Sequence, residues 1–456
     1  MNDWVKEETA ANTINDSRLN QRMAKLLSRL SKNPEASIPS AANGWAETQG
    51  AYRFLDNNKV TLPEILSGHR QATINRIKQQ SVVIIAQDTT FLNYGAETEK
   101  LKFGTLRRTP SDHYLLHPSV AFTVKRVNLG VLDAKIWQRP EEKSDQTYDK
   151  KPLIEKESYR WLEGYNTACE VQAACPDTLI VNIADREGDI HDWFLDAQQR
   201  PENSRAHYII RAKCNRRVEK DNGEGNYLWE TLHSSKSLGS FRFDTPRNKQ
   251  AVSRRVTLGL YAQEVTFVGR ESKEKEPVTL HAVMAIEKRP PAGQKPIEWM
   301  LLTSLPVDDF TSAQTVVGWY RSRWEIEIYF RVLKQGCKVQ ALRLESDKRL
   351  HNGIALYLIV SWRLHNMTMM SREFSKYPCT KIFTDKEWKS IYIWRNKTKP
   401  PKKIPSIRDI VRLLAQIGGF LARKGDGEPG VKTLWTGFQR LETYMEAMEI
   451  HESVFA

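Results

Sequence analysis

The chain has 456 residues, of which 40% are hydrophobic, and this length is sufficient for about two to four domains with sizeable cores. Lys and Arg number 69 against 55 Asp and Glu, so the formal charge of +14 favours a polyanionic partner such as nucleic acid. Five scattered cysteines without a CxxC pair argue against a disulfide framework or zinc site. No signal peptide or membrane-spanning run is present, so we expect a soluble intracellular protein.

The first 70 residues predict a small, basic, helical module. Residues 16–32 have the periodicity of an amphipathic helix that Asp16 or Ser17 could cap, and residues 45–55 and 62–78 also favour helices. The first helix carries a second stripe made only of cations: Arg18, Arg22, Lys25, Arg29 and Lys32. An unmixed stripe favours a phosphate-contacting edge, although a solvated face is the alternative interpretation.

Two short apolar runs in the next part of the chain each end in an aspartate. Residues 82–87 precede Asp88, and residues 179–184 precede Asp185; both runs are typical of strands covered on both faces. Between them we expect strands over 114–123 and 127–137 and a helix over 156–174. After Asp185 we expect a helix from Ile190, capped by Asp189, and a strand over 207–212.

The pattern changes to a β-rich insertion over about residues 217–306. Expected strands cover residues 253–261, 264–268, 278–286 and 297–302. Helices are expected over 354–370, 407–423 and 431–448, and the Lys- and Pro-containing residues 397–405 predict a linker or loop. The last helix has an apolar face that favours core packing, with a dimer contact as the alternative; the face comprises Leu434, Phe438, Leu441, Met445 and Met448.

Residues 320–334, YRSRWEIEIYFRVLK, predict a single helix with four functional candidates on one stripe. At about 100° per residue, Tyr320, Arg323, Glu327 and Lys334 fall within roughly 60° of one another. Most of the remaining circumference is apolar, which is typical of a buried helix whose polar stripe faces a cleft. The alternative is a solvated stripe of Arg–Glu pairs.

Asp88, Asp185 and Glu327 together suggest a metal site. Converging carboxylates repel one another unless a cation offsets their charge. Oxygen ligands without His or Cys suit Mg²⁺ or Mn²⁺, and two such ions could cleave a phosphodiester, with Arg323 and Lys334 holding phosphate charge. Either aspartate alone would more often be a turn or cap residue.

These motifs resemble the insertion-sequence-four family of DDE transposases. The spacing Tyr320-x2-Arg323-x3-Glu327-x6-Lys334 matches that family's YREK signature, and Asp185-Arg186-Glu187 and residues 49–54 (QGAYRF) resemble its Tn-five branch. The resemblance implies an α/β fold with an RNase H-like catalytic core, here residues 71–372, between the helical DNA end-binding module 1–70 and a helical C-terminal region 373–456 with a possible role in dimerisation.

The family's activity implies a cut-and-paste transposase that works as a homodimer on double-stranded DNA. Two Mg²⁺ ions, replaceable by Mn²⁺, would be bound by Asp88, Asp185 and Glu327. Nicking, hairpin formation, hairpin opening and joining of 3′ ends to target DNA would follow. The implied location is the bacterial cytoplasm, in association with the nucleoid.

The resemblance also implies DNA contacts. Tyr320, Arg323 and Lys334 would contact phosphate near the element's 5′ end, and Trp299 would stack on a flipped base, although a Trp in a β-core is the alternative. Further contacts are expected from cations near Asp185 and in the N-terminal module: Arg211, Lys213, Arg216, Arg217, Arg18, Arg22, Lys25 and Arg29. The alternative functions are a metal-dependent nuclease without strand transfer and a non-catalytic DNA-binding inhibitor of transposition.

Overall fold

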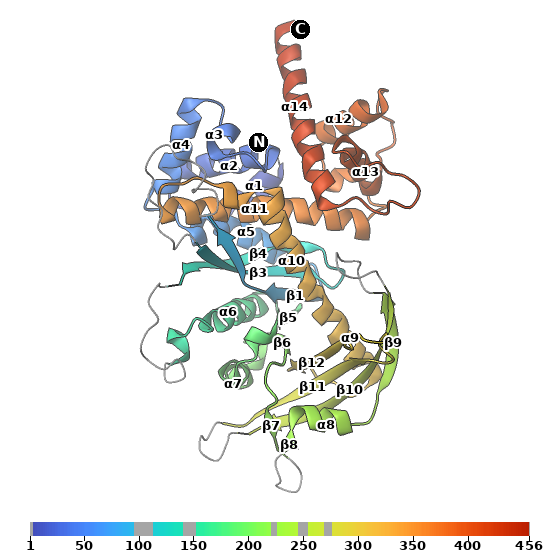
Figure 1. Ribbon diagram of the computed structural model, residues 1–456. Helices are drawn as coiled ribbons and strands as arrows, with labels where there is room; N and C mark the ends of the chain where they lie inside the picture. The colour runs from blue at the N-terminus through green and yellow to red at the C-terminus, as the bar shows by residue number, and fades with distance from the viewer. Residues whose placement is uncertain are drawn as a thin grey trace. The chain divides into compact units, whose positions relative to one another are not determined.

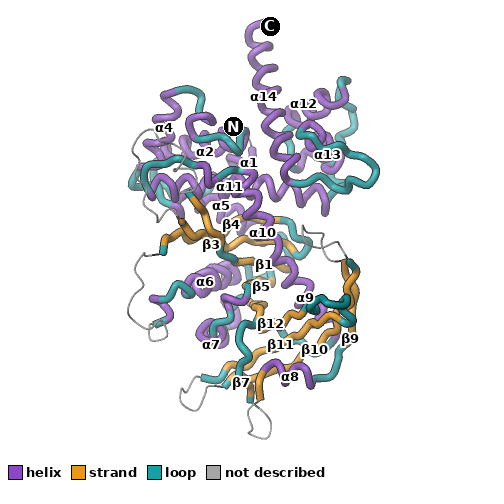
Figure 2. The backbone as a smooth tube through the Cα atoms, viewed as in Figure 1, coloured by secondary structure: helices purple, strands orange, loops and turns teal. Residues whose placement is uncertain are grey.

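The chain divides into two compact units that are discontinuous in sequence. The computed structural model describes residues 3–94, 113–139, 152–219, 226–244, 254–268 and 276–455 (Figures 1 and 2). The first unit comprises Met1–Gln79, Thr89–Lys143 and Glu325–Ala456, and the second comprises Gln80–Asp88 and Ser144–Trp324. Asp88 and Asp185 therefore belong to the second unit and Glu327 to the first.

The N-terminal part of the first unit is helical, as predicted. Its helices are α1 (Asp3–Thr9), α2 (Ser17–Lys32), α3 (Ile38–Ala41), α4 (Trp45–Asp56) and α5 (Leu62–Ile77). The Asp16 carboxylate accepts hydrogen bonds from the backbone N–H groups of Arg18 and Leu19, so it caps α2. The apolar face of α2 is buried, including Met23, Leu27 and Leu30.

A long central helix, α11 (Asp347–Glu373), organises the core of the first unit. It is buried around most of its circumference because it packs against α2, α4, α5, α13 and α14. It also contacts β4 of an antiparallel group made of β2 (Thr90–Asn93), β3 (His113–Thr123) and β4 (Asn128–Gln138). The predicted helix over 354–370 is therefore the middle of a longer one.

Three C-terminal helices complete the first unit: α12 (Asp385–Asn396), α13 (Ile407–Ile417) and α14 (Val431–Phe455). The prediction of a helix over 407–423 was too long, because α13 ends at Gly418 and Gly419, and Gly419 has a φ of +99°. Core packing of the last helix is confirmed for Leu434, Phe438, Leu441 and Met445, which are buried. Figure 1 shows α14 extending past α12 and α13 to the C-terminus.

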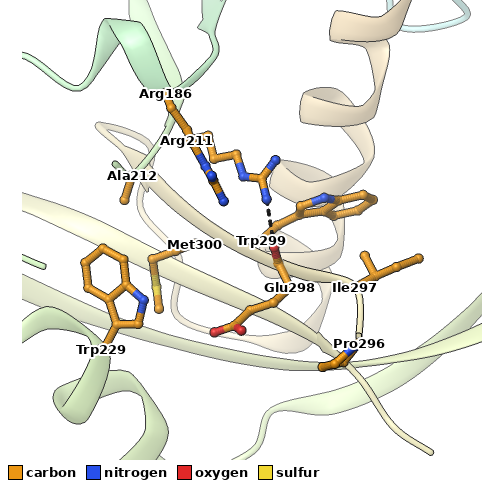
Figure 3. Close-up of a pocket in the computed structure, with 9 residues that line it drawn as sticks. All are labelled: Arg186, Arg211, Ala212, Trp229, Pro296, Ile297, Glu298, Trp299 and Met300. Atoms are coloured by element: carbon orange, nitrogen blue, oxygen red, sulfur yellow. Dashed lines mark hydrogen bonds between the residues drawn. The ribbon is translucent and has the colours of Figure 1, made fainter. Parts of the chain in front are cut away.

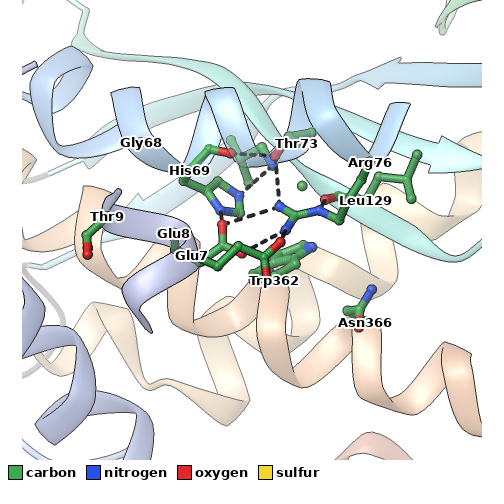
Figure 4. A network of polar contacts seen from close by, with 12 residues as sticks. Glu7, Glu8, Thr9, Gly68, His69, Thr73, Arg76, Leu129, Trp362 and Asn366 are labelled. Carbon is green, nitrogen blue, oxygen red and sulfur yellow. Dashed lines mark hydrogen bonds and ion pairs between the residues drawn. The ribbon is translucent and has the colours of Figure 1, made fainter. Parts of the chain in front are cut away.

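A buried polar network joins three elements, namely α1, α5 and β4 (Figure 4). Nδ1 of His69 contacts the Glu8 carboxylate, and Nε2 of His69 accepts the N–H of Val131 at 2.9 Å. Arg76 donates to Glu8 Oε1 at 2.7 Å and to the Leu129 carbonyl at 2.7 Å. Because Nε2 is an acceptor, the single proton of the neutral ring lies on Nδ1 and points at Glu8.

The second unit contains a mixed sheet. β1 (Val82–Gln87), β5 (Leu179–Ala184) and β6 (His207–Arg211) are parallel, and β6 pairs antiparallel with β12. The sheet continues through β12 (Glu298–Thr303), β11 (Val278–Glu287) and β10 (Arg255–Phe267) to β9 (Gly239–Asp244), β7 (Arg217–Val218) and β8 (Asn226–Tyr227). Its helices are α6 (Tyr159–Ala174), α7 (His191–Gln199), α8 (Leu228–Ser234) and α9 (Phe310–Tyr320).

The predicted β-rich insertion is present, with one correction. Residues 253–261 and 264–268 were expected as two strands, but β10 runs without interruption from Arg255 to Phe267. Ala262 and Gln263 stay in the ladder because they pair with Val283 and Ala282 of β11. The first residue of the earlier expectation, Ser253, lies outside the described residues. Among the residues that the structure describes, no helix meets the length and apolarity needed to cross a membrane.

Candidate active site

Asp88 and Asp185 occupy equivalent positions at the ends of two neighbouring parallel strands. In the register of β1 and β5, Val82 lies opposite Leu179 and Ala86 lies opposite Ile183. Asp88 directly follows β1, and Asp185 directly follows β5 at the same offset. The carboxyl ends of parallel strands share one edge of a sheet, which is the usual place for a ligand site in α/β folds. The register of β1 and β5 thus aligns the two aspartates at the same edge of the sheet.

Each aspartate already has a polar partner inside the second unit. Arg323 Nη1 donates to Asp88 Oδ2 at 2.7 Å, and the two side chains are only 18% and 17% exposed. Asp185 Oδ1 accepts the backbone N–H of Glu187 at 2.8 Å and caps the 3-10 turn Arg186–Gly188. A carboxylate has about four lone-pair positions, so these bonds leave capacity for further ligands.

Tyr320 and Arg211 lie close to this carboxylate pair. Burial raises the pKa of the Tyr320 phenol, the charges of Arg323 and Arg211 oppose the rise, and the charge of Asp185 adds to it. Burial likewise lowers the pKa of the Arg211 guanidinium, although it stays a cation. The side chains that influence one another's pKa values in this way form one electrostatic environment: Tyr320, Arg323, Arg211 and Asp185.

The stretch 320–334 is helical but is not the single α-helix that was predicted. α9 ends at Tyr320, a 3-10 turn covers Arg321–Arg323, α10 covers Trp324–Arg331, and a π-helical turn covers Val332–Gly336. In a 3-10 turn, side chains at i and i+3 eclipse, so Tyr320 and Arg323 remain on one side. A constant 100° projection fails because these two turns have different numbers of residues per turn.

Glu327 and Lys334 belong to the first unit. Both side chains are half-buried, and burial lowers the pKa of the Lys334 ammonium. The apolar remainder of the segment is buried as expected, including Ile326, Tyr329 and Leu333. The neighbouring Glu325 is buried as well, 3.7 Å from both Arg126 Nη1 and His365 Nε2. Glu325 is therefore enclosed by side chains of the protein, whereas the Glu327 side chain is partly accessible to solvent.

A cavity of about 430 Å³ lies within the second unit beside Trp299 (Figure 3). Arg186 and Arg211 extend into it together, and Trp229 and Trp299 flank it. Arg211 Nη2 donates to the Glu298 carbonyl at 3.1 Å, which holds its guanidinium there. The Trp299 ring also lies 6.2 Å from the rings of Phe243 and Tyr320.

Sequence reasoning found Trp299 and Arg211 but missed the rest of this cavity. Trp229 is on α8, a short helix that was not predicted, and Glu298 and Arg186 were not selected. The signal available for Arg186 was its position directly after a strand-end aspartate. Trp229 could not be found from spacing, because only the fold brings α8 to β12. Aromatic rings, two guanidinium groups and the Glu298 carboxylate line this space, and its aromatic walls suit a planar ligand.

One expectation for the Asp189 region was wrong. Asp189 was expected to cap α7, but its carboxylate accepts the N–H groups of Lys213 and Cys214 at 2.7 and 2.9 Å. Arg216, for which a DNA contact is predicted, pairs with the same buried carboxylate at 2.5 Å. The pair satisfies a charge that burial would otherwise penalise. Lys213 and Arg217 remain solvent-accessible in the structure.

The cationic stripe of α2 is less free than its sequence suggested. Glu47 of α4 pairs with Lys25 and lies 3.5 Å from Arg29, and Glu442 of α14 lies 3.0 Å from Lys32. Burial would raise the pKa of Glu47, but Lys25, the Asn43 N–H and Arg29 lower it to about 2. The acids come from other helices, so the spacing within α2 could not reveal them.

The end of that stripe nearest the start of α2 stays more open. The Arg18 side chain is 90% exposed, and its guanidinium lies 3.7 Å from the Asp16 carboxylate. The Arg22 guanidinium lies against Gly50 of α4, where a Cβ atom would come within 2.3 Å of Nη1. Of the predicted phosphate contacts in the module, Arg18 is therefore the most open, and Arg22 is half-buried against α4.

The donor set fits a hard divalent cation in part. Asp88 and Asp185 supply carboxylate oxygens at one sheet edge, which are the ligands that Mg²⁺ or Mn²⁺ prefers. Within the described ranges, no three His, Cys, Asp or Glu side chains form a group that could hold a metal ion.

Three family models match the chain. They are described as transposase DNA-binding over residues 1–60, transposase DDE domain over 196–363 and transposase Tn5 dimerisation domain over 359–454. The chain belongs to the Tn5-related DDE transposases. Its mixed α/β architecture is accordingly that of an RNase H-like core with helical regions at both ends.

Curated relatives share one short region with the chain. The putative transposase InsL for insertion sequence element IS186A, from Escherichia coli strain K12, is 35% identical over 75 residues, or 16% of this chain. The transposase for insertion sequence element IS421, from Escherichia coli, has the same identity over the same length. The chain spans 20% of the length of each of these relatives. The DDE match includes Glu327 but begins after both aspartates.

Proposed function

We propose that the chain is a cut-and-paste DNA transposase that binds the terminal repeats of its element, cleaves at both ends and joins the 3′ ends to target DNA. The observation that carries this proposal is the register of β1 and β5, which sets Asp88 and Asp185 beside each other at one sheet edge. The family membership and the matched DNA-binding model support DNA as the substrate.

Asp88, Asp185 and Glu327 would hold the divalent ions, which we take to be two Mg²⁺. When bound, these ions would supply Lewis-acid stabilisation of the attacking and leaving oxygens. Arg323 offsets the charge of Asp88 in this structure, so it competes with a metal for that carboxylate. On binding DNA, the guanidinium would turn from Asp88 to a backbone phosphate, to which it can donate two hydrogen bonds.

Lys334 and Tyr320 would hold the DNA strand near the reacting phosphate. Burial lowers the pKa of the Lys334 ammonium, so this cation gains more from an anionic partner than a solvated lysine would. The buried Tyr320 phenol remains protonated and can donate a hydrogen bond to a phosphate oxygen. These contacts position the backbone and provide no sequence readout.

A hairpin intermediate requires a sharp backbone turn, which is easier with one base removed from the stack. Trp299 and the adjacent cavity offer a site for that base, with Arg186 and Arg211 near its phosphate (Figure 3). The N-terminal module would bind the terminal repeat through Arg18 and Arg22. Two copies of the chain would associate through the C-terminal region that matches a dimerisation model.

The deciding experiment incubates the full-length chain with duplexes that carry the element's ends and Mg²⁺, and separates products on denaturing gels. We expect nicks, hairpins and joined products from the wild type. Asp88→Ala, Asp185→Ala and Glu327→Ala should each lower cleavage by at least about 10³-fold while end binding persists. Unimpaired cleavage by any one of the three would remove that residue from the site.

The same gels separate a transposase from the two alternative functions. A nuclease without strand transfer would yield nicks but no joined products when target DNA is added. A non-catalytic inhibitor would bind the ends and yield neither product. Either pattern from the wild-type chain would reject the proposed transposase activity.

A further inference from the structure

The loop between α12 and α13 carries an unusual concentration of uncompensated positive charge. This lysine loop, residues 397–404, contains four lysines, and no acidic residue occurs from 395 to 408. All four side chains are exposed: Lys397, Lys399, Lys402 and Lys403. In the part of the chain that the structure describes, none of the four forms an ion pair.

Lysines on the neighbouring helix α12 behave differently. Lys386 Nζ lies 2.7 Å from the Glu449 carboxylate, and Lys389 Nζ lies 2.7 Å from the Asp385 carboxylate. Surface cations in this part of the molecule therefore pair with acids where acids are within reach. The lysine loop collects like charges without such partners, and their mutual repulsion favours binding of a polyanion.

The loop is anchored at both ends. Lys397 adopts a left-handed conformation with φ of 57° and caps α12 through its N–H to the Ile393 carbonyl. At the other end, the Pro405 carbonyl accepts the N–H of Cys379 at 2.9 Å, and Ser406 caps α13. Between the anchors, Pro400 and Pro401 restrict the backbone torsions. Less conformational entropy is lost on binding than for a free basic tail.

We propose that the lysine loop is a second DNA-binding surface that holds the phosphate backbone of duplex DNA without reading its sequence. Lysine ammonium groups act as point charges toward phosphate, and they do not supply the planar fork that reads guanine. The six residue steps from Lys397 to Lys403 reach at most about 20 Å, which matches about five or six phosphates along one strand. The matched description of this region concerns dimerisation, so the DNA contact is an additional role.

This inference rests on the proposed function for its choice of DNA as the polyanion. The test uses the full-length chain with Lys397, Lys399, Lys402 and Lys403 all changed to Gln. Binding to a duplex without the element's ends is measured between about 50 and 200 mM salt. Each lost phosphate contact removes about 0.9 from the slope of log affinity against log salt, so the slope should fall by about 2 to 4.

A matched control removes the same formal charge from the adjacent surface. In it, the exposed Lys376, Lys381, Lys386 and Lys389 are changed to Gln. We expect a change in slope of less than about 1, because two of these lysines already pair with carboxylates. All eight substitutions are at exposed positions, so the melting temperatures of both variants should stay close to that of the wild type.

Three outcomes would overturn the inference. The salt slope of the loop variant could equal that of the wild type, or the salt slope of the control variant could fall as far as that of the loop variant. The loop variant could also lose affinity for duplex RNA while its affinity for duplex DNA is unchanged. Failure of the proposed function is recognised separately, because the wild-type chain would then bind duplexes without cleaving element ends. The loop variant should cleave saturating amounts of end DNA at the wild-type rate, since the loop is no part of the proposed catalytic machinery.

Discussion

At the scale of single residues, the two aspartates proposed to bind metal also have ordinary structural roles. Asp185 caps a 3-10 turn, and Asp88 receives a hydrogen bond from Arg323, so both aspartates fulfil the common role of strand-end acids. The sequence could predict that these residues follow strands, because apolar runs of this kind are local signals. It could not predict that Arg216 pairs with Asp189, since that pairing depends on a turn formed by the fold.

Trp299 tests the cavity of the second unit. In Trp299→Ala, we expect nicked DNA to accumulate over hairpin by about tenfold, because base stacking on an aromatic ring contributes about 1–3 kcal/mol. Trp299→Phe keeps an aromatic face and should restore part of the hairpin yield. Quantified gels give the product ratio, and thermal melting separates this effect from loss of folding. A product ratio equal to that of the wild type in both variants would exclude a stacking role.

His69 should make the stability of the chain depend on pH. Burial lowers the pKa of His69, and the nearby Glu8 carboxylate only partly opposes this effect. Burial by itself would raise the pKa of Glu8, but His69 and Arg76 together lower it by more, so the pKa of Glu8 is also lowered. Both folded-state pKa values therefore lie below the unfolded ones. The stabilisation from His69 is complete above about pH 6.5 and is lost as the pH falls below it; that from Glu8 is lost below about pH 4.5.

We therefore expect His69→Gln to flatten the fall in melting temperature between about pH 7 and 5. The variant should also lose about 1–3 kcal/mol at neutral pH, since a buried hydrogen-bond network is disturbed. The half-buried His207 and His351 also have lowered pKa values and will leave part of the pH slope. The exposed His113→Gln is the matched control. If both variants show the wild-type pH slope, His69 does not protonate on unfolding as proposed.

At the scale of elements, two glycines of the first unit lie where α13 and α14 pack against each other. A Cβ at Gly437 of α14 would lie 2.2 Å from the Leu414 carbonyl oxygen, and one at Gly418 would lie 1.9 Å from the Thr433 carbonyl oxygen. The absence of side chains at these two positions allows α13 and α14 to approach so closely. The sequence analysis predicted both helices but extended α13 past Gly418, because periodicity alone does not mark where a neighbour requires a glycine.

A pair of glycine substitutions separates helix propensity from packing. Gly437→Ala should lower stability by about 1–3 kcal/mol, because the added methyl forces α13 away from α14. Gly318→Ala in α9 has no atom within 4 Å of the new Cβ and should raise stability by up to about 1 kcal/mol. Denaturant titration measures both. Stabilisation by Gly437→Ala would show that the two helices can move apart at little cost.

At the scale of the whole molecule, the order of elements along the chain was largely predictable, and their grouping was not. The strands ending at Asp88 and Asp185 have the predicted bounds, and the β-rich insertion occupies the predicted region. The sequence did not indicate that this insertion extends the parallel strands through the pairing of β12 with β6. The net charge favoured a nucleic-acid partner, and a transposase DNA-binding model matches residues 1–60. Tertiary acids such as Glu47 nevertheless neutralise cations that seemed free.

The chain passes from one unit to the other at Trp324 and Glu325, within the three residues that separate Arg323 from Glu327. A helical segment advances by about 100° for each residue. Deletion or insertion of one residue here would rotate Glu327 by about that angle around the helix axis. An apolar neighbour would then occupy its position. The length of this crossing could not change without moving Glu327 off the stripe that it shares with Arg323.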